Sequence, residues 1–500
     1  MTTSPPPPYT PGPDALGPAQ SAPHAGGPRN VLMIVGAVAA VAVASTAIAL
    51  AGFLGGGGAQ PEDVIPSDAL AFAKIDLDPA AGQKVAVFRL AKRFPSTGDK
   101  VQDEDGVKDQ LLSALFEGND EVDYDTDIAP WIGDRVGVAA VPSGGDEPGV
   151  LAAIAYTDRD GAEAAMRRLQ DSDEDGETFF AFSDKADYVL LGDTQATVDA
   201  AAGTAQVLAD APAWTDAMKA LDGDQIVTAW ADLGAVWDAV PEEQQQQAAE
   251  QFGLDGGFDL DGTVVLGARA ASNYVEVVGR TLDLKAPELG SAAIGTGEGS
   301  NMAGNLPADT IAAMSITNLG AGLADLFDTV YAEAGDDPYG IIAGAEDFGV
   351  SLPDDLRTLL GEQTLAAVLG EEDFGLRART RDVDAAYRTA EDLARRVLGD
   401  DPSSGLRRLD DGIAVGSTPE ALEAISGSDG GLGKSEVFTT AVPDADRAGA
   451  VVYVDIARAI EVSGEDLGED AQDAAALQSF GLTSSGDRSD GAFRMRLTVR

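Results

Sequence analysis

The sequence contains no cysteine and only one histidine, His24, among 500 residues. The missing thiols exclude disulfides and thiolate chemistry. His24 lies in an N-terminal tail rich in proline, so the rest of the chain has no imidazole. This excludes a Ser-His-Asp triad, a histidine general base and a histidine-ligated zinc ion beyond the tail. No cofactor is expected, and we expect the protein not to be an enzyme.

Basic residues are also scarce. The chain has 33 Lys and Arg against 85 Asp and Glu, which gives a net charge of -52. Such a field repels phosphate backbones, so nucleic acid is not expected as a partner. Only Asp14 and Arg29 precede the longest apolar run, so almost the whole charge lies after that run.

That run, from Val31 to Leu54, contains no charged residue. As a helix it would reach roughly 36 Å, enough to cross a hydrocarbon core of about 30 Å. Arg29 precedes it, and the first charges after it are acidic, Glu62 and Asp63. The positive-inside rule then predicts a cytoplasmic N-terminus and an extracellular C-terminal part. A cleaved signal peptide is the alternative, but such peptides have shorter apolar cores and a basic leader.

Residues 1–30 read as a disordered cytoplasmic tail because they are rich in Pro, Gly and Ala and lack hydrophobic periodicity. Within the tail, Pro6, Pro7, Pro8 and Tyr9 match the PPxY pattern that WW-type domains bind. A cytoplasmic partner at this motif is therefore an alternative to a simple solvated tail.

The part outside the membrane reads as two related halves, residues 61–285 and 305–500. A glycine-rich linker, 55–60, precedes the first half, and a Gly/Ser/Ala-rich linker, 286–304, separates the two. In each half an apolar pair and a glycine precede two β-like runs and a helical segment, as at Trp131-Ile132-Gly133 and Leu359-Leu360-Gly361. Hairpin-like neighbours predict an α+β fold with mainly antiparallel sheets and packed helices.

A shorter pattern occurs twice in each half: an apolar run, then Asp or Asn, then a helical stretch. We interpret these polar residues as helix N-caps, because their side-chain oxygens suit the free N–H groups of a first helical turn. A ring of convergent carboxylates is the alternative, which an asparagine in one position disfavours. The four residues are Asp76, Asp232, Asn318 and Asp455.

Two further features could carry chemistry. Asp171, Asp173 and Asp175 have the spacing of a calcium loop, but the twelfth position is Phe182 where a bidentate glutamate is needed. A solvated acidic loop is the interpretation we prefer to a metal site. The four tryptophans, Trp131, Trp214, Trp230 and Trp237, are interpreted as core anchors, with a carbohydrate platform as the alternative.

The sequence at the start of the first half is similar to that of a known protein family. Ile65-Pro66-Ser67-Asp68-Ala69-Leu70, then Lys74-Ile75-Asp76-Leu77-Asp78-Pro79, and later Trp131-Ile132-Gly133-Asp134-Arg135 resemble actinobacterial membrane proteins of the domain of unknown function 3352 family. The resemblance implies a cell-envelope setting. It implies no activity and no catalytic residues.

These observations favour a non-enzymatic, membrane-anchored binding or scaffolding protein of the cell envelope, whose partner is an envelope protein or an apolar ligand. A deep apolar cavity would favour ligand carriage, and filled cores with an exposed patch would favour protein contact. The alternatives are an acid-dependent glycan hydrolase, which needs only paired carboxylates, and signalling across the membrane through the tail.

Deleting residues 31–54 tests the anchor. We expect the full chain to sediment with membranes and the deleted chain to stay in the supernatant, because the deletion removes the only long uncharged apolar run. Protease added to intact cells should degrade the part after residue 60 and spare the tail. Recovery of the deleted chain in the membrane fraction would contradict this topology.

Overall fold

The structure is a computed structural model. It describes residues 58–77, 80–98, 124–143, 148–172, 178–251, 260–285, 294–295, 302–334, 341–347, 349–398, 405–427, 430–464, 468, 471–487 and 489–500. The tail and the 31–54 run lie outside this part of the chain. None of the helices described is both long enough and apolar enough to cross a bilayer.

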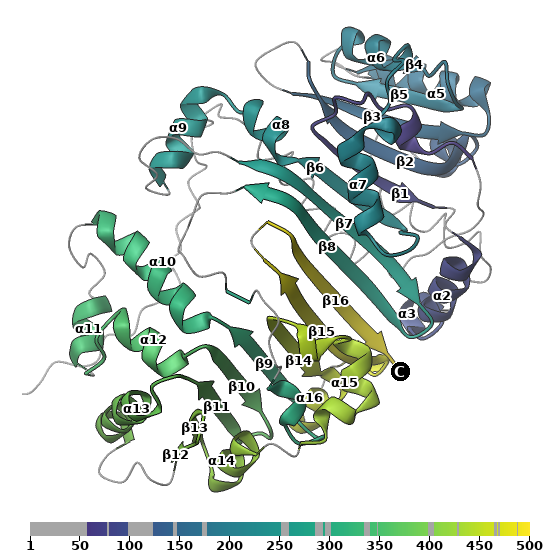
Figure 1. Cartoon of the computed structure of the whole chain (residues 1–500). Helices are drawn as coiled ribbons and strands as arrows, with labels where there is room; N and C mark the ends of the chain where they lie inside the picture. Colours follow the sequence, from purple (N-terminus) through teal and green to yellow (C-terminus); the bar gives the residue numbers. More distant parts are fainter. Residues whose placement is uncertain are drawn as a thin grey trace, which may run out of the picture.

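The architecture is mixed α and β, built on one antiparallel sheet of sixteen strands (Figure 1). This confirms the predicted α+β fold with antiparallel strands and packed helices, and the strands of both halves belong to one continuous sheet. The strands of the first half are β1 (Ala71–Asp76), β2 (Ile132–Val141), β3 (Gly149–Tyr156), β4 (Phe179–Phe182), β5 (Tyr188–Gly192), β6 (Val227–Asp232), β7 (Asp261–Ala271) and β8 (Tyr274–Lys285). Those of the second half are β9 (Ala312–Thr317), β10 (Gln363–Val368), β11 (Phe374–Arg379), β12 (Leu406–Arg408), β13 (Gly412–Gly416), β14 (Ala450–Asp455), β15 (Leu477–Gly486) and β16 (Gly491–Val499).

The strand order repeats between the halves. From the outer edge to the middle, the first half runs β4-β5-β3-β2-β1-β6-β7-β8 and the second half runs β12-β13-β11-β10-β9-β14-β15-β16. The two series meet where β8 pairs with β16, and every neighbouring pair is antiparallel. The predicted hairpin around residues 141–150 is confirmed as the β2·β3 pair.

Alternating side chains give the sheet two faces. We call face A the side that carries Trp230, Val278 and Tyr453, and face B the side that carries Val277 and Val452. The register of the paired strands shows which of these residues lie on the same side. Apolar side chains occupy both faces of most strands, so both faces need a covering layer.

Helices from each half supply these layers (Figure 1). On face A, apolar residues of α6 and α7 join the first-half core around Trp230, and residues of α14 and α15 join the second-half core around Tyr453. On face B, α5, α2 and α13 bury apolar residues against the sheet. The longer helices are α2 (Ala81–Ala91), α5 (Arg159–Ser172), α6 (Gln195–Ala202), α7 (Pro212–Ala220), α9 (Glu242–Gln251), α10 (Leu319–Ala334), α13 (Val383–Leu398), α14 (Pro419–Ser426) and α16 (Ile456–Ser463). The shorter ones are α3 (Pro95–Gly98), α8 (Leu233–Asp238), α11 (Ile341–Asp347), α12 (Asp354–Leu360), α15 (Glu436–Ala441) and α17 (Ala471–Ala474).

The junction between the halves, which we call the seam, is the β8·β16 pair. On face B, α2 residues Val87 and Leu90 belong to the same apolar cluster as Met495 of β16. Within the pair, Phe493 lies opposite Gly279, where the absent side chain leaves room for the phenyl ring. The helix of one half therefore helps to cover a strand of the other.

On face A, the seam is held by a buried carboxylate. Glu276 of β8 is fully buried, and its Oε1 accepts a hydrogen bond of 2.6 Å from Arg269 Nε of β7. From β16, Arg496 Nε donates to Oε2 at 2.6 Å, and Arg494 Nε lies 3.2 Å from the same oxygen. One carboxylate thus joins three adjacent strands, and removing it would leave three guanidinium groups without their shared anion.

Replacing Glu276 with glutamine should destabilise the fold strongly. The side-chain size is kept but the buried ion pairs are lost, so we expect a loss of about 3 to 5 kcal/mol in the free energy of unfolding. Urea titration followed by circular dichroism measures it. As a control, Glu423→Gln removes only an exposed ion pair with Arg407, and its effect should stay below about 1 kcal/mol. Equal effects of the two variants would contradict the role given to Glu276.

Candidate functional site

The largest apolar cavity described lies on the sheet of the second half. It has a volume of about 910 Å³ and is formed on strands β9, β10, β11, β13 and β14, which places it at the middle of that half. Much of its lining is the face B side chains of these strands. The side chains are Ala312, Met314, Ala366, Val368, Phe374, Leu376, Val415, Val452 and Val454.

A second apolar cavity of about 390 Å³ adjoins the first. It lies between the strands β11, β12 and β13 and the helices α12 and α13, which contribute Leu359, Leu360 and Leu393. The two cavities share Leu376, Gly405, Val415 and Gly416. Together they form one continuous depression, which we call the groove.

The groove is apolar and open to solvent. Phe374 is 61% exposed and Val415 is 37% exposed, and Met314 and Val368 are exposed as well. None of the residues that line either cavity is an Asp, Glu, His, Lys or Arg, and the one tyrosine among them, Tyr453, is buried. The Ser417 hydroxyl is already occupied, since it donates to the Glu372 carbonyl at 2.8 Å and accepts from the Phe374 amide at 2.9 Å. Such a surface suits a hydrocarbon ligand and offers no group for acid-base chemistry.

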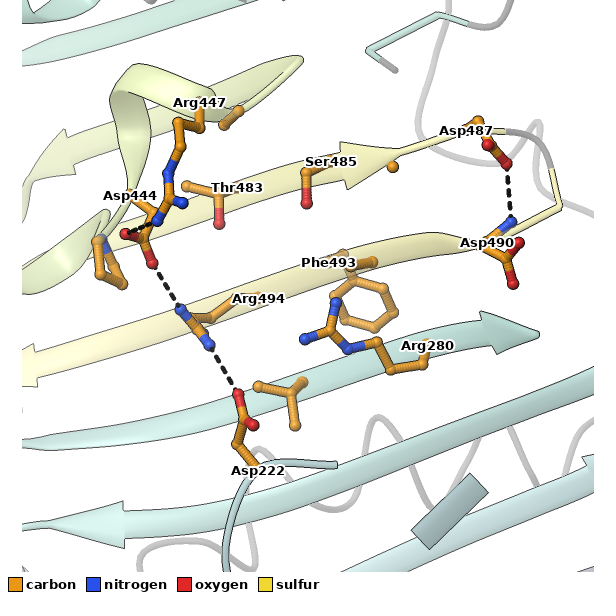
Figure 2. A pocket seen from close by; sticks show the side chains of 15 residues that line it. Asp222, Arg280, Asp444, Arg447, Thr483, Ser485, Asp487, Asp490, Phe493 and Arg494 are labelled. Carbon is orange, nitrogen blue, oxygen red and sulfur yellow. Dashed lines mark hydrogen bonds and ion pairs between the residues drawn. The ribbon is translucent and has the colours of Figure 1, made fainter. Parts of the chain in front are cut away.

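The seam holds a cavity of opposite character (Figure 2). This seam cavity has a volume of about 560 Å³ and lies beside β8, β15 and β16. Three arginines and four aspartates line it, namely Arg280, Arg447, Arg494, Asp222, Asp444, Asp487 and Asp490. The described part of the chain therefore holds both an uncharged depression and a strongly charged one.

Two of the predicted caps begin helices. Asp232 Oδ1 accepts from the Ala235 amide at 2.9 Å at the start of α8, and Asp455 Oδ1 accepts from the Arg458 amide at 3.0 Å at the start of α16. Asn318 directly precedes α10, and its carbonyl accepts from the Gly322 amide at 2.9 Å. Its φ of 57° differs from the extended backbone found at Asp232 and Asp455.

Asp76 does not cap a helix, so that prediction is wrong. The helix that follows, α2, begins at Ala81 with Ala80 at the N-cap position. Asp76 is instead the last residue of β1, lies opposite Arg135 of β2, and its Oδ1 is 3.4 Å from Arg135 Nε. Burial raises the pKa of Asp76, although Arg135 and Lys74 act to lower it. The four acid or amide residues therefore do not share one role, and they do not converge on one site.

The calcium-loop candidate is only partly described. Asp171 is exposed near the end of α5, and Asp173 and Asp175 lie outside the described residues. Within the described ranges, no group of three or more His, Cys, Asp or Glu side chains could hold a metal ion. The PPxY residues Pro6, Pro7 and Tyr9 also lie outside the described part of the chain.

Three of the four tryptophans, Trp131, Trp214 and Trp230, are buried, as expected for core anchors. Trp214 packs edge-on against Phe72 and Trp230, with ring centroids 5.3 and 6.0 Å apart. These rings cannot line a carbohydrate cleft, because they are inside the first-half core.

Sequence reasoning did not find the groove. Its signal is present in runs such as residues 364–368 and 450–454, which are apolar at consecutive positions and not only at alternate ones. Such runs are typical of strands covered on both faces, so they predict burial. In the structure one of these faces is left partly uncovered.

Fold and cavities together define a mixed α+β protein with a large antiparallel sheet and an open apolar groove. The chain belongs to the family described as Protein of unknown function (DUF3352), whose model matches residues 30–393. No curated protein matches the chain. A solved structure titled "Structure of crystal form I of TP0453" is 10% identical; the match covers 48% of this chain and 82% of that one, with a TM-score of 0.21.

The raised pKa of Asp76 gives a pH dependence that can be measured. Between its ordinary value of 3.8 and the raised folded value, the folded chain holds the proton more tightly than the unfolded chain. The free energy of unfolding of the wild type, relative to that of Asp76→Asn, should therefore fall as pH rises through this window. The slope for one group is at most about 1.4 kcal/mol per pH unit. If the free energy of unfolding of the wild type, relative to that of Asp76→Asn, rises with pH instead, the ion pair with Arg135 outweighs the effect of burial on Asp76.

Proposed function

We propose that this chain is a non-enzymatic, membrane-anchored binding protein of the cell envelope that holds an apolar ligand in the groove. The observation that carries the proposal is the pair of adjoining cavities, whose lining includes no Asp, Glu, His, Lys or Arg. Their volumes of about 910 and 390 Å³ match those of ordinary small-ligand sites, roughly 300 to 1,000 Å³.

Hydrocarbon burial would supply the binding energy. Each methylene group moved from water into the groove is worth about 0.8 kcal/mol, so a chain of ten gives roughly 8 kcal/mol before the cost of association. The groove offers no cation for a carboxylate headgroup, and the net charge of -52 repels anions. These points favour a ligand with a neutral or cationic polar end that stays in solvent.

The repeated strand order supports an internal duplication, which we propose for residues 61–285 and 305–500. In the first half, Val236 of α8 and Ala239, which follows α8, pack over Ala71, Ala140 and Ala231 of β1, β2 and β6. The strands in the corresponding places of the second half, β9, β10 and β14, line the groove. One copy of the unit would thus have a covered sheet at this place and the other a ligand site.

An anchor at residues 31–54 would hold the start of the first half close to the bilayer, because only three residues separate Leu54 from the first described residue, Gly58. Three or four extended residues reach about 14 Å at most. The acid-dependent glycan hydrolase and the signalling role of the tail remain alternative proposals. The buried tryptophans weaken the first, because it relied on them as a sugar platform.

A charge placed in the groove should abolish ligand binding. We propose Val415→Asp, because Val415 belongs to both cavities and is already 37% exposed, so the variant should fold. The full chain in lipid nanodiscs is titrated with the neutral fluorescent probe N-phenyl-1-naphthylamine. Binding is measured as the fluorescence that saturates in the presence of protein and does not saturate with empty discs. We expect at least tenfold weaker binding, because a buried carboxylate is costly in an apolar site.

The matched control is Val138→Asp, which places the same charge on face B of the first half at a valine that is 43% exposed. It should bind the probe as the wild type does. Wild-type chain that shows no saturable binding, or equal binding by all three proteins, would overturn the proposal.

A further inference from the structure

Arginines gather around the seam in a chain that has few of them. Arg269, Arg280, Arg447, Arg494 and Arg496 lie on or beside β7, β8 and β16, out of 33 Lys and Arg in the sequence. Their nearby acidic partners are Glu276, Asp222 and Asp444. Since the Debye length is about 8 Å at physiological salt, these close groups set the local field more than the distant carboxylates do.

Arg494 is only loosely engaged on its solvent side. Its Nε faces the buried Glu276, while Nη2 lies 3.7 Å from Asp222 and Nη1 lies 3.6 Å from Asp444. Charge-assisted hydrogen bonds are normally 2.7 to 2.9 Å long. Figure 2 shows Arg494 between these two aspartates, with a dashed line from the guanidinium group to each. Because both contacts are long, the terminal nitrogens can donate to a better placed oxygen in the seam cavity.

Arg280 lies close by on β8 and is still less engaged. Its Nε donates to the Ala220 carbonyl at 3.3 Å, which fixes the direction of the side chain. Figure 2 shows the guanidinium extending from β8 toward the side of the cavity where Arg494 lies. No carboxylate among the described residues lies within ion-pair distance of it.

We propose that the seam cavity binds the phosphate of a phosphodiester, held between the guanidinium groups of Arg280 and Arg494. Planar guanidinium groups match phosphate oxygens in pairs, and the hydroxyls of Thr483 and Ser485 line the same cavity. A volume of about 560 Å³ leaves room for the groups esterified to the phosphate.

The two aspartates at one end of the cavity explain why a monoanion is preferred. Asp487 accepts from the Ser489 amide at 2.9 Å and the Asp490 amide at 3.0 Å, and these bonds help to lower the pKa of Asp487. Asp490 accepts from the Asp283 amide at 3.3 Å. These bonds hold both side chains at this end of the cavity, where they would repel a dianionic monoester more strongly than a singly charged diester.

This site is separate from the groove, because Arg280 and Arg494 project on face A whereas the groove lies on face B. A single small ligand cannot occupy both. The phosphodiester proposal therefore stands or fails independently of the proposed apolar ligand.

Calorimetric titration of the full chain in a non-ionic detergent tests the proposal. The probes are glycerophosphoglycerol, a water-soluble diester, and dihexanoylphosphatidylglycerol, a soluble lipid with the same headgroup. We expect saturable binding of at least one, and binding at least tenfold weaker by Arg280→Gln, which keeps an amide near the Ala220 carbonyl. The matched control Arg407→Gln, at an exposed arginine far from the seam, should bind as the wild type does.

A second variant is expected to strengthen binding of the diester. Asp222→Asn removes a carboxylate that competes for Arg494, and its side chain is mostly exposed, so it should fold and bind the diester about threefold more tightly or better. Binding of both probes identifies the phosphodiester itself as the ligand group, and binding of the lipid alone identifies a lipid headgroup. No saturable binding by the wild type, unchanged binding by Arg280→Gln, or weaker binding by Asp222→Asn would overturn the proposal.

Discussion

The structure depends on one buried carboxylate, that of Glu276, at the place where, among the described strands, the two halves share a strand pair. Three arginines from two neighbouring strands converge on it, so the β8·β16 pair is held by ionic contacts on face A and by the α2 residues on face B. The halves cannot separate without breaking the contacts of this carboxylate with Arg494 and Arg496. They are best regarded as one cooperative unit and not as two tethered domains.

From this arrangement the two cavities follow. A sheet of sixteen strands has two long faces, and the helices available do not cover them evenly. Where α8 covers the first half, the corresponding strands of the second half stay open and apolar, which forms the groove. At the seam, Arg494, which contacts Glu276, lines a charged cavity together with Arg280 and Arg447. Both sites thus arise from how the sheet is covered and joined.

The sequence predicted the local features well and the long-range ones poorly. The β2·β3 hairpin, the caps at Asp232 and Asp455, and the buried tryptophans all depend on short spacings or on side-chain chemistry. The single sheet was missed because it needs Val277 to pair with Met495, and no pattern in the chain records a partner so far away. Asp76 was predicted to be an N-cap because it follows an apolar run and precedes an apolar residue. A strand residue that pairs with Arg135 fits the same pattern, and this is what the structure shows. The groove was missed because an apolar strand does not reveal which of its faces is covered.

The ends of the sheet carry a further consequence. Its outermost strands, β4 and β12, span only Phe179–Phe182 and Leu406–Arg408, far less than the seam strands β8 and β16 with twelve and nine residues. Unpaired edges invite other chains to add strands, and short edges offer few hydrogen bonds to a newcomer. With both edges this short, so wide a sheet offers little template for the addition of further chains and does not become the seed of a fibre.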